Sequence, residues 1–374
     1  MTGYEPGPLR FRYWPFDLVP RPGARLVWAD RANLRIQIER LGRRLGRHEA
    51  VSLHLLWADF GAGKSHTLLF LKQEAEDGRY GPILPLYSAL PKGCRGFIDV
   101  YRAIVRGIPG SLLRDAYERG VVTLGRVEVE RRLTETWPNL ARCFQAIAIG
   151  SEAHQRTALG WLHAEGSVPT AELQGLSILG RVRSTDDAVL ALCGVVELFN
   201  LAGYRRTMFM VDEFQRVATL RRQQQDDVNA GLHGFFNGAP HGMSLLLSFS
   251  FGDEKNIRHF LNAELLSRAD PLRISIGALT GEEGRAFLDD VINQARETSS
   301  DWPVAADVVS EIVASVPDRL KLTPRRLIKA AGLVFDSAAN GFEDGSLIEL
   351  TAQYVRDMVA AGEFSRIDED ERED

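Results

Sequence analysis

A glycine-rich segment between two apolar stretches carries the residue types that bind phosphate. Gly61 and Gly63 precede Lys64 and Ser65. Glycines let backbone N–H groups approach phosphate oxygens, and the N-terminus of a following helix adds partial positive charge. The lysine would reach the β- and γ-phosphates, and the serine hydroxyl would ligate Mg²⁺. We therefore predict that ATP and Mg²⁺ are the cofactors, bound by Ala58, Asp59, Phe60, Gly61, Ala62, Gly63, Lys64, Ser65 and His66.

The spacing of this segment follows G-x-x-x-x-G-K-[ST], with one departure. Ala58 stands where the first glycine is usual, and it is a small residue suited to a tight strand-to-loop turn. His66, which follows the motif, has no evident partner in the sequence, and its simpler interpretation is an ordinary helix residue. A Gly-Lys-Ser tripeptide alone is weak support. Its position between an apolar strand pattern and an apolar helix pattern is the context that the motif requires.

Two adjacent carboxylates end another apolar stretch. The segment Met208–Val211 leads directly into Asp212 and Glu213. Asp212 would hold Mg²⁺ through water, and Glu213 would orient and polarise an attacking water molecule. Both roles need acids at the carboxyl edge of a parallel sheet, where ligands of open α/β sheets bind. An apolar strand that ends in an acid is common by chance, so this prediction depends on the phosphate loop.

The elements that must position these residues are predicted from apolar patterns. Strands are expected at 51–57, 81–90, 207–213, 243–251 and 271–276. Helical patterns separate them, which predicts an α/β fold with a P-loop NTPase parallel sheet flanked by helices. Residues 97–200 show helical patterns only and are predicted to form a large helical insertion.

After residue 278 only helical patterns remain. Thr280 and Glu283 fit a capping box, and Thr323 with Pro324 fits an N-cap followed by proline at N1. Helices are expected near 281–296, 305–316, 323–338 and 348–361. The predicted domains are an extended lead-in at 1–27, an ATPase core at 28–278, an all-helical lid at 279–362 and an acidic disordered tail at 363–374.

The composition excludes several classes. The net charge of −5 gives no support to nucleic-acid binding by bulk positive charge, and the arginine pairs at 43–44, 205–206 and 221–222 are expected to be solvated faces. The three cysteines, Cys94, Cys143 and Cys193, are far apart, which excludes a disulfide framework and favours a cytoplasmic location. No stretch approaches the roughly 18 apolar residues that span a bilayer, so no membrane partner is expected.

The order of these features resembles the AAA+ ATPases of the initiator-related branch. The phosphate loop is followed by Asp212-Glu213, a polar fourth strand, an arginine before the fifth strand and a helical lid. The "DEFQ" at 212–215 is similar to the DE-x-Q of ExeA-type and transposition-regulator ATPases. The lead-in is similar to a segment that closes over adenine, although Ala29-Asp30-Arg31 replaces the usual Gly-Arg-Glu. The "FGAGKSH" sequence also resembles ATPases of bacterial phage-defence systems such as BREX.

This resemblance, which covers about 20–95 and 200–362, implies further catalytic residues. A polar residue of the fourth strand, Ser250 or Ser248, would contact the γ-phosphate or the attacking water. Arg268 would be an arginine finger donated to the nucleotide of a neighbouring subunit. On the lid, Arg325 would reach the γ-phosphate, with Arg326 as the alternative.

The resemblance also implies partners and a function. An arginine finger implies a homo-oligomer in the form of a ring or spiral. The expected protein hydrolyses ATP with Mg²⁺ and acts as an assembly factor on DNA or a DNA-bound partner, in transposition, replication or phage defence. The alternative is a slow-turnover ATP/ADP switch that recruits a protein through residues 97–200. The sequence lacks N-K-x-D and L-S-G-G-Q motifs, which argues against GTP and against ABC ATPases.

Overall fold

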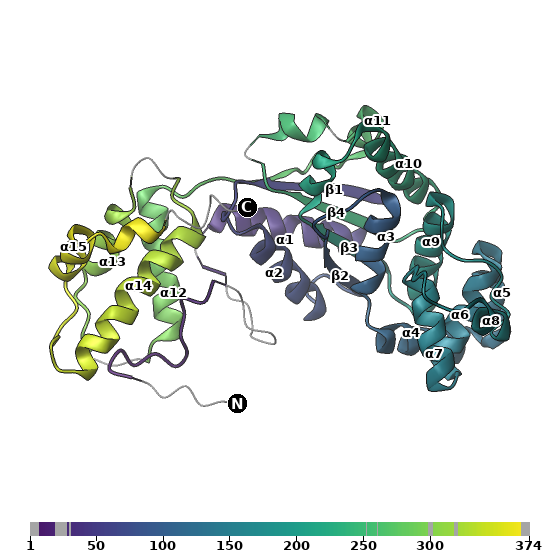
Figure 1. The fold of residues 1–374 in the computed structure, drawn as a ribbon, viewed down its shortest axis with the longest axis horizontal. Helices are drawn as coiled ribbons and strands as arrows, with labels where there is room; N and C mark the ends of the chain where they lie inside the picture. Colours follow the sequence, from purple (N-terminus) through teal and green to yellow (C-terminus); the bar gives the residue numbers. More distant parts are fainter. Residues whose placement is uncertain are drawn as a thin grey trace. The chain divides into compact units, whose positions relative to one another are not determined.

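The computed structural model describes residues 7–18, 28–29, 31–251, 253–259, 261–297, 302–317 and 321–367 (Figure 1). The chain divides into two compact units. Unit 1 comprises Met1–Ile36, Asp59–His66 and Ile276–Asp374, and unit 2 comprises Gln37–Ala58 and Thr67–Ser275. Unit 1 therefore combines the lead-in, the phosphate loop and the lid, whereas the sequence patterns place the loop in the core. Two helices continue from one unit into the other, α1 (Ala32–Arg47) and α2 (Lys64–Glu76).

Unit 2 is built on a five-stranded sheet in the order β2-β3-β4-β1-β5. The pairs β2–β3, β3–β4 and β4–β1 are all parallel. This confirms the predicted parallel α/β sheet. The strands β1 to β4 begin within two residues of their predicted starts, and β5 begins three residues after its predicted start. The strands are β1 (Ser52–Ala58), β2 (Ile83–Ala89), β3 (Arg206–Asp212), β4 (Met243–Phe249) and β5 (Ile274–Ile276). Parallel pairing puts the ends of β1, β3 and β4 at one edge of the sheet.

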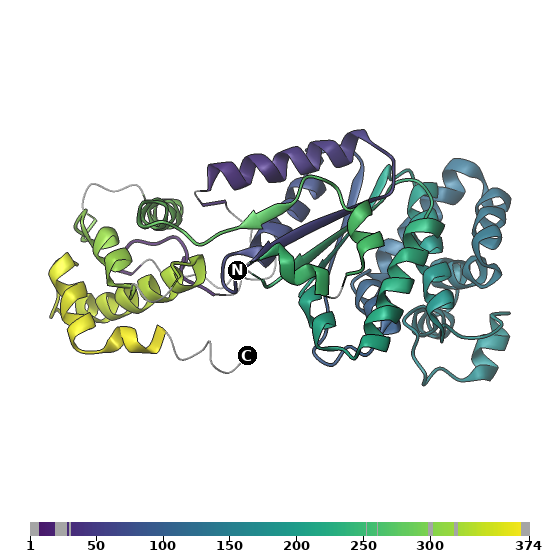
Figure 2. The same ribbon diagram turned by 90° about the horizontal axis from the view of Figure 1, so that it is seen from above.

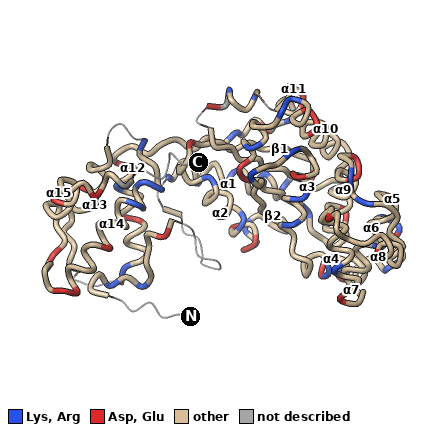
Figure 3. Tube along the Cα trace, in the orientation of Figure 1, with Lys and Arg blue, Asp and Glu red and all other residues tan. Residues whose placement is uncertain are grey.

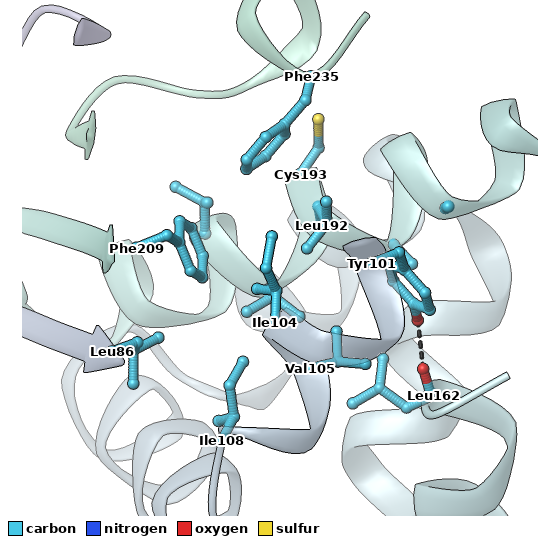
Figure 4. Packing of buried hydrophobic residues seen from close by; sticks show 14 of the residues in the cluster. Leu86, Tyr101, Ile104, Val105, Ile108, Leu162, Leu192, Cys193, Phe209 and Phe235 are labelled. Atoms are coloured by element: carbon cyan, nitrogen blue, oxygen red, sulfur yellow. Dashed lines mark hydrogen bonds between the residues drawn. The ribbon is translucent and has the colours of Figure 1, made fainter. Parts of the chain in front are cut away.

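Apolar side chains cover both faces of the sheet, as parallel sheets require. On one face, Phe209 and Leu86 pack in a cluster with Ile104 of α3 (Phe97–Arg106) and Leu192 of α9 (Thr185–Leu201), as Figure 4 shows. Alternate strand residues such as Leu56, Met210 and Leu246 are buried on the other face. This two-sided burial holds the carboxyl edge of the sheet in a fixed arrangement.

The predicted helical insertion is entirely helical between β2 and β3, apart from its connections. Its helices α4 to α8 gather beyond α3 and α9, away from the strands (Figures 1 and 2). Tyr101 of α3 joins the two parts because its hydroxyl donates a hydrogen bond to the Leu162 carbonyl (Figure 4). The cluster consists of α4 (Gly110–Leu124), α5 (Arg126–Thr136), α6 (Pro138–Ile149), α7 (Glu152–Leu162) and α8 (Thr170–Gly175).

Arg206 corrects one expectation from the sequence. Its side chain is 1% exposed, so it is not part of a solvated basic face. Its guanidinium donates to the carbonyls of Leu45 at 2.7 Å and Met243 at 3.2 Å, among others. Burial lowers its pKa to about 10, since charge is costly away from water. Arg206 therefore ties α1 to the amino edge of the sheet, the edge opposite to Asp212.

The described residues of unit 2 between β3 and β5 form further helices on either side of β4. They are η1 (Phe214–Thr219), α10 (Arg222–Gly238), η2 (Glu254–His259) and α11 (Ala263–Arg268). In unit 1, the lid has its own apolar core, into which Leu9, Phe11 and Phe16 of the lead-in are packed. Its helices are α12 (Gly281–Ala295), α13 (Val308–Ser315), α14 (Pro324–Glu343) and α15 (Ala352–Ala360).

Both predicted helix caps in the lid are confirmed. Thr280 and Glu283 form the capping box of α12, and Thr323 caps α14 with proline at its first position. The predicted disordered tail is wrong for its first residues. Residues Glu363–Ile367 form the 3-10 helix η3, in which Phe364 and Ile367 are buried in the lid core. The acidic residues 368–374 lie outside the described residues.

Candidate nucleotide-binding site

The phosphate loop has the backbone that its glycines predict. Gly61 and Gly63 have φ angles of 73° and 98°, a region that residues with a side chain rarely adopt. The Ala62 N–H donates to the Asp59 carbonyl at 3.2 Å and closes a turn. A Cβ on Gly61 would lie 3.2 Å from Cβ of Arg325, whereas a Cβ on Gly63 would meet nothing within 4 Å. Gly61 is required for packing and conformation, and Gly63 for conformation alone.

The first turn of α2 presents the lysine and the serine of the motif. Lys64 is the first residue of the helix and is 6% exposed, whereas Ser65 is exposed. The first turn has no acidic residue, so nothing there offsets the positive N-terminal end of the helix. An ammonium group and a helix N-terminus beside strained glycines fit a polyphosphate. The residues present therefore suit the predicted nucleotide.

The lid contacts the phosphate loop within unit 1. The Arg325 backbone N–H donates to the Gly61 carbonyl at 3.3 Å, and the Arg325 guanidinium lies 5.0 Å from the centre of the Phe60 ring. Lys321 Nζ lies 2.5 Å from Oδ2 of Asp59. Arg326 is 8% exposed and donates to the Lys321 carbonyl at 2.6 Å. Of the two arginines left open by the sequence, Arg325 is the one at the loop.

Arg31 is a contact of the loop that the sequence analysis missed. Its guanidinium donates to the Ala62 carbonyl at 3.0 Å and to the Gly277 carbonyl at 2.9 Å. Its backbone φ of 56° is unusual for a residue with a side chain. The neighbouring Asp30 lies outside the described residues. The departure from Gly-Arg-Glu at 29–31 was the available signal, because it put an arginine where the related proteins have glutamate.

The acidic strand end belongs to unit 2 and is built from side chains that are far apart in sequence. Asp212, the last residue of β3, is 1% exposed. Its Oδ1 accepts hydrogen bonds from the Ser248 hydroxyl and, at 2.8 Å, from the Glu213 N–H. Its Oδ2 accepts one from the Tyr87 hydroxyl at 3.0 Å. These donors fix the orientation of the carboxylate, as the partners of metal-ligand groups commonly do.

Glu213 follows in a left-handed conformation with φ 59°. Its Oε2 accepts a hydrogen bond from Gln215 Nε2 at 2.9 Å and lies 3.3 Å from the Arg216 guanidinium. Arg216 also donates to the Leu90 carbonyl, in the connection after β2. Non-glycine residues in this conformation are strained and concentrate at functional sites. The glutamate is thus held by its own 3-10 turn and by the end of the neighbouring strand.

The two candidate serines of the fourth strand differ in position. Both were predicted on one strand face, but β4 ends at Phe249, so Ser250 lies beyond it. The Ser250 N–H donates to Gln215 Oε1 at 3.1 Å instead of to a strand neighbour. Its buried hydroxyl has no hydrogen-bond partner among the described residues. Ser248 is occupied with Asp212, whereas Ser250 keeps an unused hydroxyl next to the Gln215–Glu213 pair.

Arg268 ends α11 and is held within its own chain. Its guanidinium donates to Asn237 Oδ1 at 2.6 Å and lies 3.1 Å from Nε2 of His233, both on α10. Glu264 lies 3.6 Å away. His66, the last residue of the predicted loop, faces the Trp28 ring at a centroid distance of 6.5 Å.

The described residues contain no group of three or more His, Cys, Asp or Glu side chains placed to hold a metal ion. None of the helices in the described part of the chain is long and apolar enough to cross a membrane.

Comparisons with known proteins agree with this architecture. Residues 124–255, which include the acidic strand end, match the family "BREX system ATP-binding protein BrxC/D". The ORC2 protein of Aeropyrum pernix, solved in ADPNP–ADP complexes, is 14% identical with a TM-score of 0.57, covering 94% of this chain and 72% of that one. Its ADP form gives a TM-score of 0.52 at 14% identity, covering 92% and 71%. No protein with a curated description matches the chain in sequence.

Because their sequence identity is low, the structural matches show the fold alone. Together with the phosphate loop and the acidic strand end, they confirm the predicted resemblance, including its weaker BREX component. The chain shares its fold with these solved structures and is similar over residues 124–255 to the BREX system ATP-binding proteins BrxC/D.

Proposed function

We propose that this ATPase binds ATP with Mg²⁺ on the phosphate loop and hydrolyses it with the acidic strand end. Lys64 would contact the β- and γ-phosphates, and Ser65 and Asp212 would hold Mg²⁺. The metal, when bound, neutralises charge that develops on the phosphates. Glu213 would orient the attacking water, and the free hydroxyl of Ser250 would contact that water or the γ-phosphate. The observation that carries the proposal is the loop at the start of α2, in which Gly61 and Gly63 both have positive φ angles.

Two arginines would complete the site. Arg325 already contacts the loop through Gly61 and Phe60, which supports its assignment to the γ-phosphate. Arg268 would serve the nucleotide of a neighbouring subunit in a homo-oligomer. It would first have to leave Asn237, His233 and Glu264, and the charge of a triphosphate would compensate for the loss of these contacts.

The ATP cycle would drive assembly on DNA or on a DNA-bound partner. The order of motifs, similar to initiator-related ATPases, and the BREX family match support this setting. Nucleotide shifts an assembly equilibrium only if it binds the assembled state more tightly, which a shared site would provide. The alternative, a slow ATP/ADP switch that recruits a protein, is favoured by the large helical insertion, a substantial surface outside the sheet.

One experiment separates these functions. ATP turnover per subunit is measured against protein concentration, with and without duplex DNA, for the wild type, Glu213→Gln, Arg268→Ala and the exposed control Arg222→Ala. We expect Glu213→Gln to retain labelled ATP while turnover falls about 10²- to 10⁴-fold. Arg268→Ala should lose the rise of turnover with concentration that the control keeps.

Normal hydrolysis by Glu213→Gln would show that the catalytic assignment is wrong. Tightly bound ADP in the purified wild type, with turnover independent of DNA and of concentration, would favour the switch.

A further inference from the structure

A cavity in the helical insertion lies apart from the nucleotide site, within unit 2. It encloses about 160 Å³ and is lined by apolar side chains that include Ile98, Trp161, Val168 and Leu173. This volume is sufficient for one aliphatic or aromatic side chain. An open hollow of about 520 Å³ adjoins it, because Ile98 and Arg102 line both.

Arginines surround this pair of hollows. Arg102 is engaged, with Asp99 at 2.9 Å and the Ala164 carbonyl at 3.1 Å. Arg181 is also engaged and donates to the Gly166 carbonyl at 3.2 Å. Arg95 lines the open hollow and Arg183 lines the cavity, and both are exposed. The structure gives neither of these two guanidinium groups a hydrogen bond or ion pair with a described residue.

Two of the three acids that line these hollows accept hydrogen bonds from described residues. Asp227 accepts from the Phe97 N–H at 2.8 Å and from the Thr185 hydroxyl at 2.5 Å. Asp99 accepts from Arg102 and from the Arg95 N–H at 2.8 Å. Glu165, the third acid, lies 3.8 Å from Nδ1 of His163, which is beyond hydrogen-bond distance, and burial lowers the pKa of that imidazole. The two unpaired guanidinium groups of Arg95 and Arg183 therefore outnumber the one carboxylate without a hydrogen bond, and guanidinium groups match carboxylates. Elsewhere in the insertion basic and acidic residues are interspersed (Figure 3).

We propose that these hollows are a docking site for an acidic protein segment that carries one apolar anchor side chain. The anchor would fill the cavity, and flanking carboxylates would bind Arg95 and Arg183. A phosphodiester chain would satisfy the arginines but would leave the apolar cavity empty, so the lining favours a peptide. The proposal specifies the partner that the proposed function requires and rests on that function for its purpose, but binding itself needs no nucleotide.

The site has a short route to the nucleotide machinery. Pro91 and Gly93 of the connection after β2 line the open hollow, and Leu90 of the same connection accepts a hydrogen bond from Arg216. Arg216 in turn lies 3.3 Å from the Glu213 carboxylate. A peptide bound to this connection would therefore contact residues next to Leu90, whose carbonyl holds Arg216 beside Glu213.

The test selects a random heptapeptide library on the immobilised full chain without nucleotide. The peptides that are enriched are then measured by fluorescence anisotropy. The variants are the pair Arg95→Glu with Arg183→Glu, and Gly166→Phe, which fills the cavity. Gly166 lines the cavity, has no strained φ, and a Cβ there meets nothing within 4 Å. Controls are Gly166→Ala and the exposed pair Arg142→Glu with Arg222→Glu. Thermal unfolding verifies that each variant is folded.

We expect the library to yield acidic peptides with one Leu, Ile, Met or Phe. The arginine-pair variant and Gly166→Phe should each bind these peptides at least about tenfold more weakly than the wild type, and the control variants should bind them as the wild type does. Enrichment of basic or neutral peptides, or of none, would overturn the proposal. The proposal would also be overturned if a dT20 oligonucleotide bound the wild type, if the arginine-pair variant lost this binding, and if that variant lost binding of no peptide. If Gly166→Phe unfolds, the arginine pair decides. Lost ATP turnover with intact peptide binding would contradict only the proposed function.

Discussion

The phosphate loop and the acidic strand end differ in what fixes their conformations. The loop takes its shape from main-chain conformation, namely two glycines with positive φ and a helix start. The strand end relies on side chains, since Asp212 is held by Ser248 and Tyr87 from two other strands. The main-chain conformation of the loop depends on consecutive residues. The side-chain network at the strand end depends on residues that are far apart in sequence and that the fold brings together.

This difference predicts how each region responds to change. In the loop, one residue supplies the charge and its neighbours supply the shape, so a single loss removes binding. At the strand end several donors share one carboxylate, so a single loss weakens its support in proportion to the donor removed. Variants of the loop that keep binding, or variants of the strand end with effects unrelated to the donor removed, would contradict this comparison.

Lys64→Ala gives the largest expected effect. Removing a buried ammonium group proposed to contact two phosphates should lower ATP affinity at least about 100-fold, which amounts to abolished binding at ordinary concentrations. Titration with a fluorescent ATP analogue measures it. Lys72→Ala is the matched control, because Lys72 lies on the same helix and pairs only with Glu76 in the described contacts. Equal affinity of Lys64→Ala and the control would show that the loop does not bind ATP.

The same contrast explains what the sequence could predict. The strands, the two caps in the lid and the phosphate loop follow from local patterns, and these were located to within a few residues. The donors to Asp212 could not be found, since Tyr87 lies 125 residues away and is adjacent only because β2 pairs with β3. The end of β4 was misplaced because Gln215 takes the backbone bond that would have extended it. Arg31 was missed since its partners are backbone carbonyls.

Ser248→Ala and Ser250→Ala should give different defects of intermediate size. Ser248 orients Asp212, and loss of such an outer partner typically weakens metal binding about 10- to 100-fold. We therefore expect a raised Mg²⁺ concentration at half-maximal turnover for Ser248→Ala, with little change at saturating Mg²⁺. Ser250→Ala should lower turnover at saturating Mg²⁺ and leave the Mg²⁺ requirement unchanged. Turnover measured over a Mg²⁺ series separates them, and identical profiles would show that the two serines share one role.

Tyr87→Phe should give the smallest effect, for a reason that tests the comparison itself. Tyr87 donates to the same carboxylate as Ser248, but it is half-buried on the edge strand β2, whereas Ser248 is fully buried. Water can replace the phenol, so we expect about a twofold to fivefold rise in the Mg²⁺ requirement, in line with one ordinary hydrogen bond. If Tyr87→Phe matched Ser248→Ala, burial would not set the strength of these supports. In the double variant Asp212 would lose both of these side-chain donors, so the Mg²⁺ requirement should exceed the product of the two single effects.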